Sequence, residues 1–255
     1  MLTDFHALHH ADRPFLLPNA WDFASAAALL AEGFPAIGTT SLGVAVAAGL
    51  PDAAGVTRDE TVALARRLVR LPCPITVDIE AGFSEDPAEV GDLVAELASL
   101  GVAGVNLEDG RGDALADVDT HAALVRTAKQ AAPSLFVNAR VDTYWLSVDA
   151  TVPVTVDRAR AYLDAGADGI FVPGLAAAED IAAVVGAVPA PLNVLPGLPL
   201  DRLADLGVRR VSTGSLLFRA ALHATVATAR AVRDSMPLPP ELPGYAEVAA
   251  LGTLG

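Results

Sequence analysis

Short apolar runs alternate with longer amphipathic stretches along nearly the whole chain. Residues 57–70, 87–100 and 155–165 are Ala-rich stretches in which apolar positions recur with helical period, and they predict amphipathic helices. The apolar runs have the length of β-strands and occupy residues 15–19, 36–40, 75–78, 104–107, 136–140, 169–172, 192–194 and 210–212. The pattern predicts strands and helices in strict alternation.

Residues at the element boundaries support this alternation. Thr57 is followed three positions later by Glu60, as in a capping box, and Asp86-Pro87 combines a cap with a first-turn proline. The segments AEGFPAIGTT, SLGVAGVNLE, DAGADGIFVP and DLGVRRVSTG each read as helix end, glycine and strand. Glycine accepts the left-handed turn that ends a helix, so these segments mark helix-to-strand turns.

Eight such units predict an α/β fold of the (β/α)8 TIM barrel type, which typically takes about 250 residues. We expect residues 1–235 to form the barrel and residues 236–255 to form a helical tail that packs on the barrel or on a neighbouring subunit. An open doubly wound sheet is the alternative. Against it, no G-x-G-x-x-G follows the first strand and no GxxxxGK[ST] occurs in the chain.

Composition narrows the class of function. Apolar residues make up 53% of the chain, yet no apolar stretch is long enough to span a membrane without a proline, glycine or charge. The first residues carry acids and histidines rather than the apolar core of a secretion signal, so we expect a cytoplasmic protein. The net charge of −14 argues against nucleic-acid and anionic-membrane partners.

Two residue types are informative because they are rare. Cys73 is the lone cysteine, which excludes an internal disulfide and a cysteine metal cluster, and its place before the third strand suggests a structural role. Lys129 is the only lysine and lies within a helical stretch. Schiff-base and pyridoxal enzymes need a lysine in the site, so neither mechanism is expected.

Charged side chains gather where three successive strands should end. They are Asp78 and Glu80, then Glu108 and Asp109, then Arg140 and Asp142. Active sites of TIM barrels are built at the carboxyl ends of the strands, and none of the five histidines falls at such an end. Oxygen ligands without histidine favour Mg²⁺, or Mn²⁺, over Zn²⁺, so we expect Asp78, Glu80 and Glu108 to form a metal site. The simpler alternative is that these acids cap helices or pair with arginines.

Other residues are candidates for contacts with a substrate. The planar guanidinium of Arg140 suits a carboxylate, although it could instead pair with Asp142. Asn193 is expected to contact substrate at the end of the seventh strand, whereas Asn106 and Asn138 are expected to satisfy buried polar groups. The remaining candidates are Ser41, Leu42 and Gly43, whose amides could bind an anion, Asp52, which could close over the site, and Trp21, which could wall the pocket or belong to the core.

The segments PNAWD, TTSLGVAVAAGLPD, VDIEAGF, GVNLEDG and NARVDTYW together resemble the isocitrate lyase/phosphoenolpyruvate mutase superfamily in order and spacing. The resemblance implies a Mg²⁺-dependent barrel that acts on 2-oxo or 2-hydroxy acids. It implies that Asp78 binds the metal directly, that Glu80 and Glu108 hold it through water, and that Asp52 supports the water shell. It also implies that the Ser41 and Leu42 amides grip the carboxylate together with Arg140, and that dimers or tetramers form by exchange of C-terminal helices.

Two departures from the superfamily pattern bear on the reaction. Glu80 stands where the usual D-x-D motif has a second aspartate, and the segment LEDGRGDALADVDTH replaces the K-[KR]-C-G-H loop of the lyases. Without a loop cysteine, water or a loop group such as Arg111 or Asp113 must supply the proton. The first hypothesis is therefore an enzyme that breaks a C–C bond of a small 2-oxo acid through an enolate, as a lyase, decarboxylase or hydrolase. The alternatives are an enzyme of C–P bond chemistry and a 2-oxo acid binding protein with degenerate catalysis.

Overall fold

Parallel strands close into an α/β barrel in the computed structural model, which describes residues 4–254, and the predicted TIM-barrel fold is confirmed. The strand order is β1-β11-β10-β9-β8-β5-β4-β3-β2. Pro18 divides the first predicted strand into β1 and β2, which pair with β11 and β3 and so complete the ring. The strands are β1 (Phe15–Leu17), β2 (Asn19–Ala20), β3 (Ile37–Thr39), β4 (Ile75–Asp78), β5 (Gly104–Glu108), β8 (Phe136–Arg140), β9 (Gly169–Phe171), β10 (Leu192–Val194) and β11 (Arg210–Ser212).

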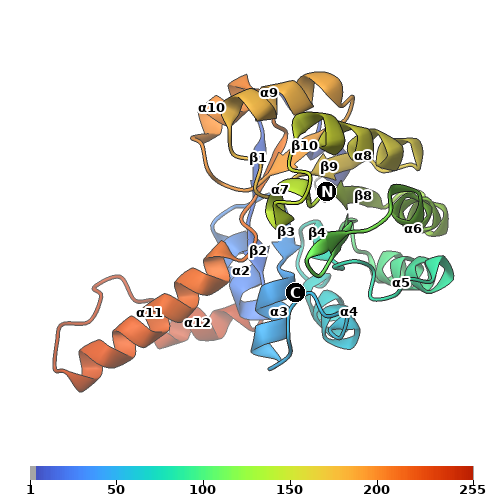
Figure 1. Cartoon of the computed structure of the whole chain (residues 1–255). Helices are drawn as coiled ribbons and strands as arrows, with labels where there is room; N and C mark the ends of the chain where they lie inside the picture. The colour runs from blue at the N-terminus through green and yellow to red at the C-terminus, as the bar shows by residue number, and fades with distance from the viewer. Residues whose placement is uncertain (1–3, 255) are drawn as a thin grey trace.

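Helices surround this ring on its outer side (Figure 1). They bury their apolar faces against the strands, and residues such as Leu64, Leu93, Leu97 and Leu124 are almost fully removed from water. The outer helices are α2 (Phe23–Ala31), α4 (Arg58–Leu68), α5 (Pro87–Leu100), α6 (Val118–Ala131), α8 (Val152–Asp164), α9 (Ala178–Ala187) and α10 (Leu200–Asp205). Two short helices, α3 (Ser41–Ala47) and α7 (Thr143–Leu146), directly follow β3 and β8 at the carboxyl ends of these strands. This two-layer core positions the strand ends rigidly.

A short N-terminal helix, α1 (Phe5–Leu8), closes the end of the barrel at which the strands begin. Phe5 packs on Phe15 and Phe136, the first residues of β1 and β8, and forms a separate apolar cluster with them. His9 stacks on Phe136 with ring centroids 3.9 Å apart, and its Nδ1 donates a hydrogen bond to the Phe5 carbonyl at 2.9 Å. The opposite end of the barrel is thereby left as the open one.

Burial of two histidines predicts a stability that falls in acid. Burial lowers the pKa of His9 and of His121, on α6, to about 3, whereas an unfolded histidine titrates near 6.5. Below pH 6.5 the unfolded state therefore binds more protons, so each histidine removes about 1.4 kcal/mol of stability per pH unit. We therefore expect the difference in free energy of unfolding, His9→Phe minus wild type, to increase by about 2 kcal/mol when the pH is lowered from 7 to 5. Urea unfolding of both proteins at the two pH values would measure this difference. An unchanged difference between the two proteins would contradict this.

One local expectation was wrong. The Thr57 side chain does not cap α4, because its hydroxyl donates to Glu80 at 2.6 Å instead. A contact with a neighbouring strand end therefore replaces the capping box that the local sequence predicts. The small-residue segment after β3 forms helix α3 over residues 41–47. The Asp86 cap with Pro87 in the first turn of α5 is confirmed.

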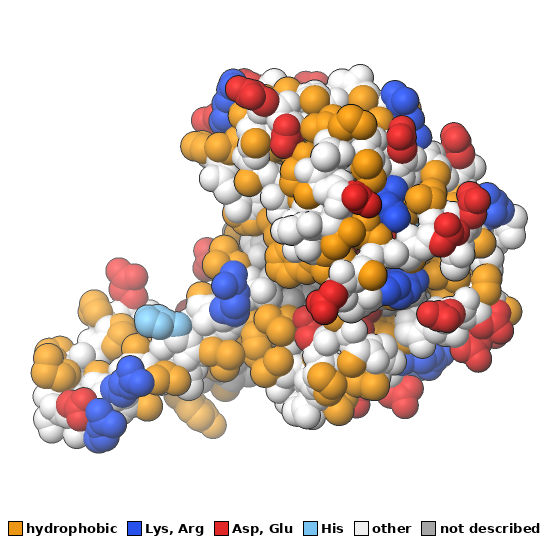
Figure 2. All heavy atoms as spheres, viewed as in Figure 1, with side chains coloured by type: hydrophobic (Ala, Val, Ile, Leu, Met, Phe, Trp, Pro, Cys, Tyr) orange, Lys and Arg blue, Asp and Glu red, His pale blue; other side chains and the backbone are white. Residues whose placement is uncertain are grey.

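The chain leaves the barrel after β11 as a long helix, α11 (Leu216–Arg233), followed by α12 (Tyr245–Leu251). The two helices form an arm that projects from the barrel in Figure 1, and α12 returns toward α2. Apolar side chains are spread along this arm in Figure 2. Within residues 4–254, no helix is both long enough and apolar enough to cross a membrane.

Candidate active site

A cavity of about 990 Å³ opens at the carboxyl ends of the strands. Asp78, Glu80, Glu108, Arg140 and Asp142 all line it, although they come from three separate stretches of the sequence. The parallel pairing of β4, β5 and β8 brings them together, with Asp78 in register with Asn106 and Glu108 in register with Arg140. The predicted gathering of charge at one end of the barrel is therefore present in the structure.

Asp78 and Glu80 are fixed by hydrogen bonds with neighbouring elements. The Asp78 amide donates to Thr39 Oγ1 at 2.9 Å, and its carboxylate accepts from the Glu80 amide at 3.1 Å. Glu80 has a positive φ of 49°, so the strand has ended there and its side chain turns aside. Thr57 Oγ1 donates to this carboxylate at 2.6 Å and the Gly55 amide donates at 3.2 Å. The loop after α3 thus holds Glu80 at the edge of the cavity.

Arg140 bridges two carboxylates. Its Nη1 lies 2.5 Å from Glu108 Oε2 and its Nε donates to Asp142 Oδ1 at 2.6 Å. Its guanidinium also lies over the rings of Trp145 and Phe171, at 5.7 and 5.9 Å from their centroids. Burial disfavours its charge, but the carboxylates of Glu108, Asp142 and Asp78 outweigh burial and raise its pKa. Arg140 is therefore a permanent cation within the site.

Negative charge exceeds positive charge around the cavity. Six acids line it, namely Asp52, Asp78, Glu80, Glu85, Glu108 and Asp142, against the three arginines Arg111, Arg140 and Arg219. Burial raises the pKa of Asp78 to about 6 and that of Glu108 to about 8, because the guanidinium of Arg140 does not compensate for lost water. A bound cation would relieve this excess of buried negative charge.

The donor set fits a hydrated divalent cation. The donors are carboxylate oxygens, which suit Mg²⁺, and the buried Asp52 Oδ1 has no hydrogen-bond partner among the described residues. Within residues 4–254, no three acidic, histidine or cysteine side chains converge closely enough to ligate one ion directly. An ion bound at these carboxylates would need water for most of its ligands, as Mg²⁺ usually retains.

The structure places the other predicted substrate residues in two groups. Ser41, Leu42 and Asp52 line the cavity. Trp21, Gly43 and Asn193 are not among the residues that line it: the Trp21 ring packs on Phe218, and a Cβ at Gly43 would lie 2.7 Å from Trp21. Asn193 lies inside the barrel, where its amide donates to Ser212 Oγ at 3.0 Å. Asn106 accepts from Asn138 and Arg210, as expected of a residue that satisfies buried polar groups, and it also lines the cavity.

Sequence reasoning missed two polar residues of the barrel interior. Asn19, at the end of the first strand, lines the cavity and accepts hydrogen bonds from Thr213 Oγ1 and the Gly214 amide, which ties β2 to the segment after β11. Arg210 is completely buried and donates to Ser212 Oγ and Asn106 Oδ1, and burial lowers its pKa to about 9. The signal for both was a polar residue within an apolar run, as in PNAWD and RRVS.

Residues that were excluded from the chemistry also lie outside the cavity lining. Lys129 pairs with Asp168 at 2.7 Å, next to the first residues of β8 and β9. Cys73 is buried just before β4, and burial raises the pKa of its thiol to about 11. Neither residue therefore supplies a nucleophile or a Schiff base to this cavity.

Comparisons with known proteins match this architecture over most of the chain. The family model for phosphoenolpyruvate phosphomutase matches residues 5–233. The chain is 49% identical to an uncharacterised protein of Mycobacterium tuberculosis, over 96% of this chain and 95% of that protein. It is 31% identical to an oxaloacetate decarboxylase of Pseudomonas paraeruginosa, over 91% of this chain and 85% of that one. The crystal structure of 2,3-dimethylmalate lyase, a phosphoenolpyruvate mutase/isocitrate lyase superfamily member, superposes with a TM-score of 0.86 at 25% identity, covering 100% of this chain and 96% of that one.

Proposed function

This chain belongs to the phosphoenolpyruvate mutase/isocitrate lyase superfamily, and from that premise we propose that it is a Mg²⁺-dependent enzyme that breaks a C–C bond of a small 2-oxo or 2-hydroxy acid through an enolate. One observation carries the proposal. Carboxylates from three successive strand ends surround a single buried arginine in one cavity. Similarity to a decarboxylase and to a C–C lyase supports this choice of bond.

In this proposal Arg140 binds the substrate carboxylate. Its Nε and Nη1 contact Asp142 and Glu108, which leaves Nη2 to donate to a substrate. The two carboxylates fix the plane of the guanidinium, and the rings of Trp145 and Phe171 limit its access to water. A planar, oriented donor of this kind suits a carboxylate. The Ser41 and Leu42 amides are proposed to complete the grip.

Asp78, Glu80, Glu108 and Asp52 are proposed to hold the cation, with Asp78 as the direct ligand. When bound, Mg²⁺ supplies positive charge opposite the negative charge that develops on the 2-oxygen during bond cleavage. Thr57 and Gly55 orient Glu80 for this role by their hydrogen bonds. The carboxylates thus select the cation, while Arg140 orients the acid beside it.

The proposed reaction also needs a group that protonates the enolate carbon after bond cleavage. Arg111 lines the cavity, but its Nη1 donates to the carbonyls of Glu108 and Gly110, and Asp113 is not part of the lining. An arginine does not release its proton near neutral pH. We therefore assign protonation of the enolate carbon to water, which favours substrates whose leaving group departs easily, such as oxaloacetate-like acids.

Proton and phosphorus NMR of the purified protein would test this function. The panel holds oxaloacetate, 2-methylisocitrate, isocitrate, phosphoenolpyruvate and phosphonopyruvate, each with Mg²⁺ and with EDTA. The expected result is Mg²⁺-dependent loss of a C–C bonded acid. Release of a phosphorus-containing product would support C–P chemistry instead. Ligand resonances that broaden with Mg²⁺ but show no turnover would support a binding protein.

We also propose that the arm of α11 and α12 assembles subunits. Leu222 and Val226 lie one helical turn apart on α11 and are 47% and 49% exposed, and Tyr245 at the start of α12 is 93% exposed. A projecting helix with an exposed apolar face is marginal alone in water and is stabilised by a partner. A second copy, exchanging the same arm, is the expected partner.

Substitution on α11 tests this assembly. The wild-type protein is expected to run as a dimer or tetramer by light scattering. The double variant Leu222→Glu, Val226→Glu should run as a monomer, because charge on the apolar face opposes its burial. A control at Ala224→Glu, which is exposed on the opposite side of α11, should keep the wild-type mass if the apolar face carries the interface. A monomeric wild-type protein would contradict the proposal.

A further inference from the structure

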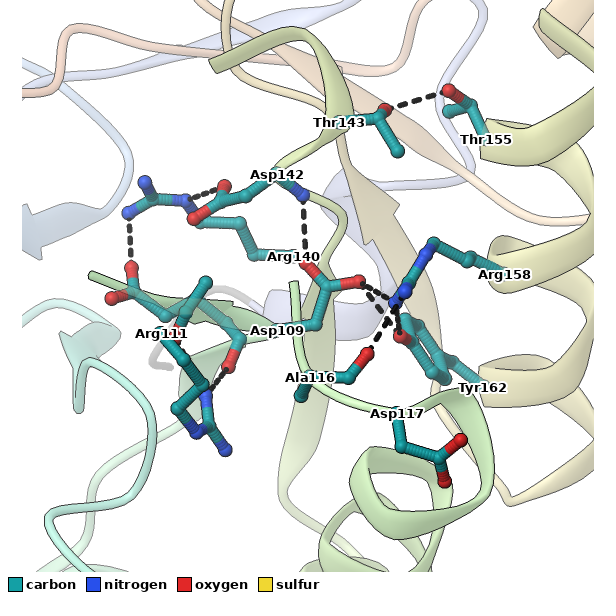
Figure 3. A network of polar contacts seen from close by, with 12 residues as sticks. Asp109, Arg111, Ala116, Asp117, Arg140, Asp142, Thr143, Thr155, Arg158 and Tyr162 are labelled. Atoms are coloured by element: carbon teal, nitrogen blue, oxygen red, sulfur yellow. Dashed lines mark hydrogen bonds and ion pairs between the residues drawn. The ribbon is translucent and has the colours of Figure 1, made fainter. Parts of the chain in front are cut away.

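Adjacent residues at the end of β5 point in opposite directions. Glu108 faces the cavity, whereas Asp109 is completely buried, is absent from the cavity lining and points toward α8 (Figure 3). A buried carboxylate is costly unless it is fully hydrogen-bonded. The role proposed for the active site does not use Asp109, so its burial calls for another explanation.

The side chain of Asp109 joins α8 to the chain that carries Arg140. Its Oδ2 accepts from Tyr162 OH at 2.7 Å and from Arg158 Nη1 at 2.8 Å. Its Oδ1 accepts from the backbone amide of Asp142 at 2.8 Å, and its own amide donates to the Arg140 carbonyl at 3.1 Å. Asp109 thus holds the backbone on both sides of Val141, with its amide at Arg140 and with its carboxylate at Asp142, and the carboxylate joins this backbone to α8.

Asp109 and its partner Arg158 also hold a hairpin that forms part of the cavity wall. Strands β6 (Gly110–Arg111) and β7 (Ala114–Leu115) form an antiparallel hairpin directly after Asp109. The Ala116 amide donates to the Asp109 carbonyl at 2.8 Å, and Arg158 Nη2 donates to the Ala116 carbonyl at 2.8 Å. Both ends of the hairpin are therefore tied at its base, and the hairpin contributes Gly110, Arg111 and Gly112 to the cavity.

The two effects meet at Asp142. Its amide is held by Asp109, while its side chain accepts from Arg140 Nε at 2.6 Å. The hairpin packs so closely that a Cβ at Gly110 would lie 2.6 Å from Asp142 Oδ2. A shift of Asp109 would therefore move Asp142, and with it the guanidinium of Arg140.

We propose that Asp109, clamped by Arg158 and Tyr162, is a positioning residue that orients Arg140 for the substrate carboxylate and holds the β6–β7 hairpin as a fixed wall of the site. The inference rests on the proposed function, in which Arg140 binds that carboxylate. Asp109 touches neither substrate nor metal. Its effect passes through Asp142.

The test compares Asp109→Asn with Asp168→Asn. Asp168 is a matched control because its carboxylate also pairs with a basic side chain, that of Lys129, and also accepts from a backbone amide, that of Val137. Unlike Asp109, it is not connected to the wall of the cavity, and it lies outside the cavity lining. Calorimetry would measure binding of Mg²⁺ alone and of oxalate in the presence of Mg²⁺. Oxalate is the probe because it presents a carboxylate beside a second oxygen donor and cannot be cleaved.

Asp109→Asn is expected to weaken oxalate binding at least ~10-fold and to leave binding of Mg²⁺ alone within about twofold of wild type, because misplacement of a binding group by about 1 Å has large effects. Asp168→Asn should bind both ligands like wild type, even if its thermal stability falls as much as that of Asp109→Asn. Tyr162→Phe, which keeps the ion pair, serves if Asp109→Asn does not fold, and it should weaken oxalate binding several-fold. Wild-type oxalate affinity in the folded variant would overturn the positioning role. Failure of the wild-type protein itself to bind oxalate with Mg²⁺ would overturn the proposed function.

Discussion

Replacement of Asp78 by alanine is expected to lower Mg²⁺-dependent turnover at least ~10³-fold, since several kcal/mol of transition-state stabilisation depend on the cation. Asp78 is the proposed direct ligand, and it lies at the centre of the acidic cluster with hydrogen bonds at its amide and its carboxylate. Steady-state kinetics across a range of Mg²⁺ concentrations would measure the loss. Excess Mg²⁺ should not restore activity.

This loss should not come from unfolding. Burial raises the pKa of Asp78 to about 6, so its ionised form is unfavourable in the metal-free fold, and a neutral residue should leave that fold at least as stable at pH 7. The control is Asp86→Ala, which removes the cap of α5 and costs about 1 kcal/mol while leaving the site intact. Turnover of Asp78→Ala within tenfold of wild type would refute the assignment of the metal ligand.

Arg140→Met should impair both catalysis and stability. The variant keeps much of the side-chain length but loses the guanidinium, so kcat/KM should fall by about 10²-fold or more because the substrate carboxylate loses a charge-assisted partner. It also leaves the buried carboxylates of Glu108 and Asp142 without their cation. Removal of one partner from a buried ion pair typically costs about 3–5 kcal/mol.

Two further variants separate these effects. Arg140→Lys keeps the charge but not the planar fork, so it should recover stability better than it recovers kcat/KM. Arg160→Met, on α8, removes an exposed arginine that donates to the Ala187 carbonyl, outside the cavity lining, and should behave like wild type. Urea unfolding and kinetics on the same preparations would show this. Equal recovery of both quantities in Arg140→Lys would argue that Arg140 only balances charge.

The sequence predicted the strands and main helices well because each carries its own periodic signal. All eight apolar runs coincide with strand positions, and residues 87–100 are helical as expected. The signal was insufficient where tertiary contacts decide. The hydroxyl of Thr57 prefers the distant Glu80 to its own helix, and the hairpin 110–115 is stabilised by Asp109 and Arg158, which no local pattern connects.

The site divides in the same way. Carboxylates at strand ends were predictable, because parallel pairing brings neighbouring ends together, and Asp52, Ser41 and Leu42 do line the cavity. The sequence did not show which polar side chains within a strand reach the cavity and which stay inside the barrel. Asn193 lies within β10 and faces Ser212, whereas Asn106 reaches the cavity from within β5. Roles of individual residues beyond this placement remain predictions for the variants above.

A crystal structure of the protein with Mn²⁺ and oxalate, in which the anomalous signal of the metal locates the ion, would test the proposed metal and substrate sites together. We expect one Mn²⁺ ion bonded to a carboxylate oxygen of Asp78, reached through water by Glu80 and Glu108, with oxalate chelating the ion and accepting a hydrogen bond from Arg140. An ion bound elsewhere, or oxalate held without contact to Arg140, would contradict it.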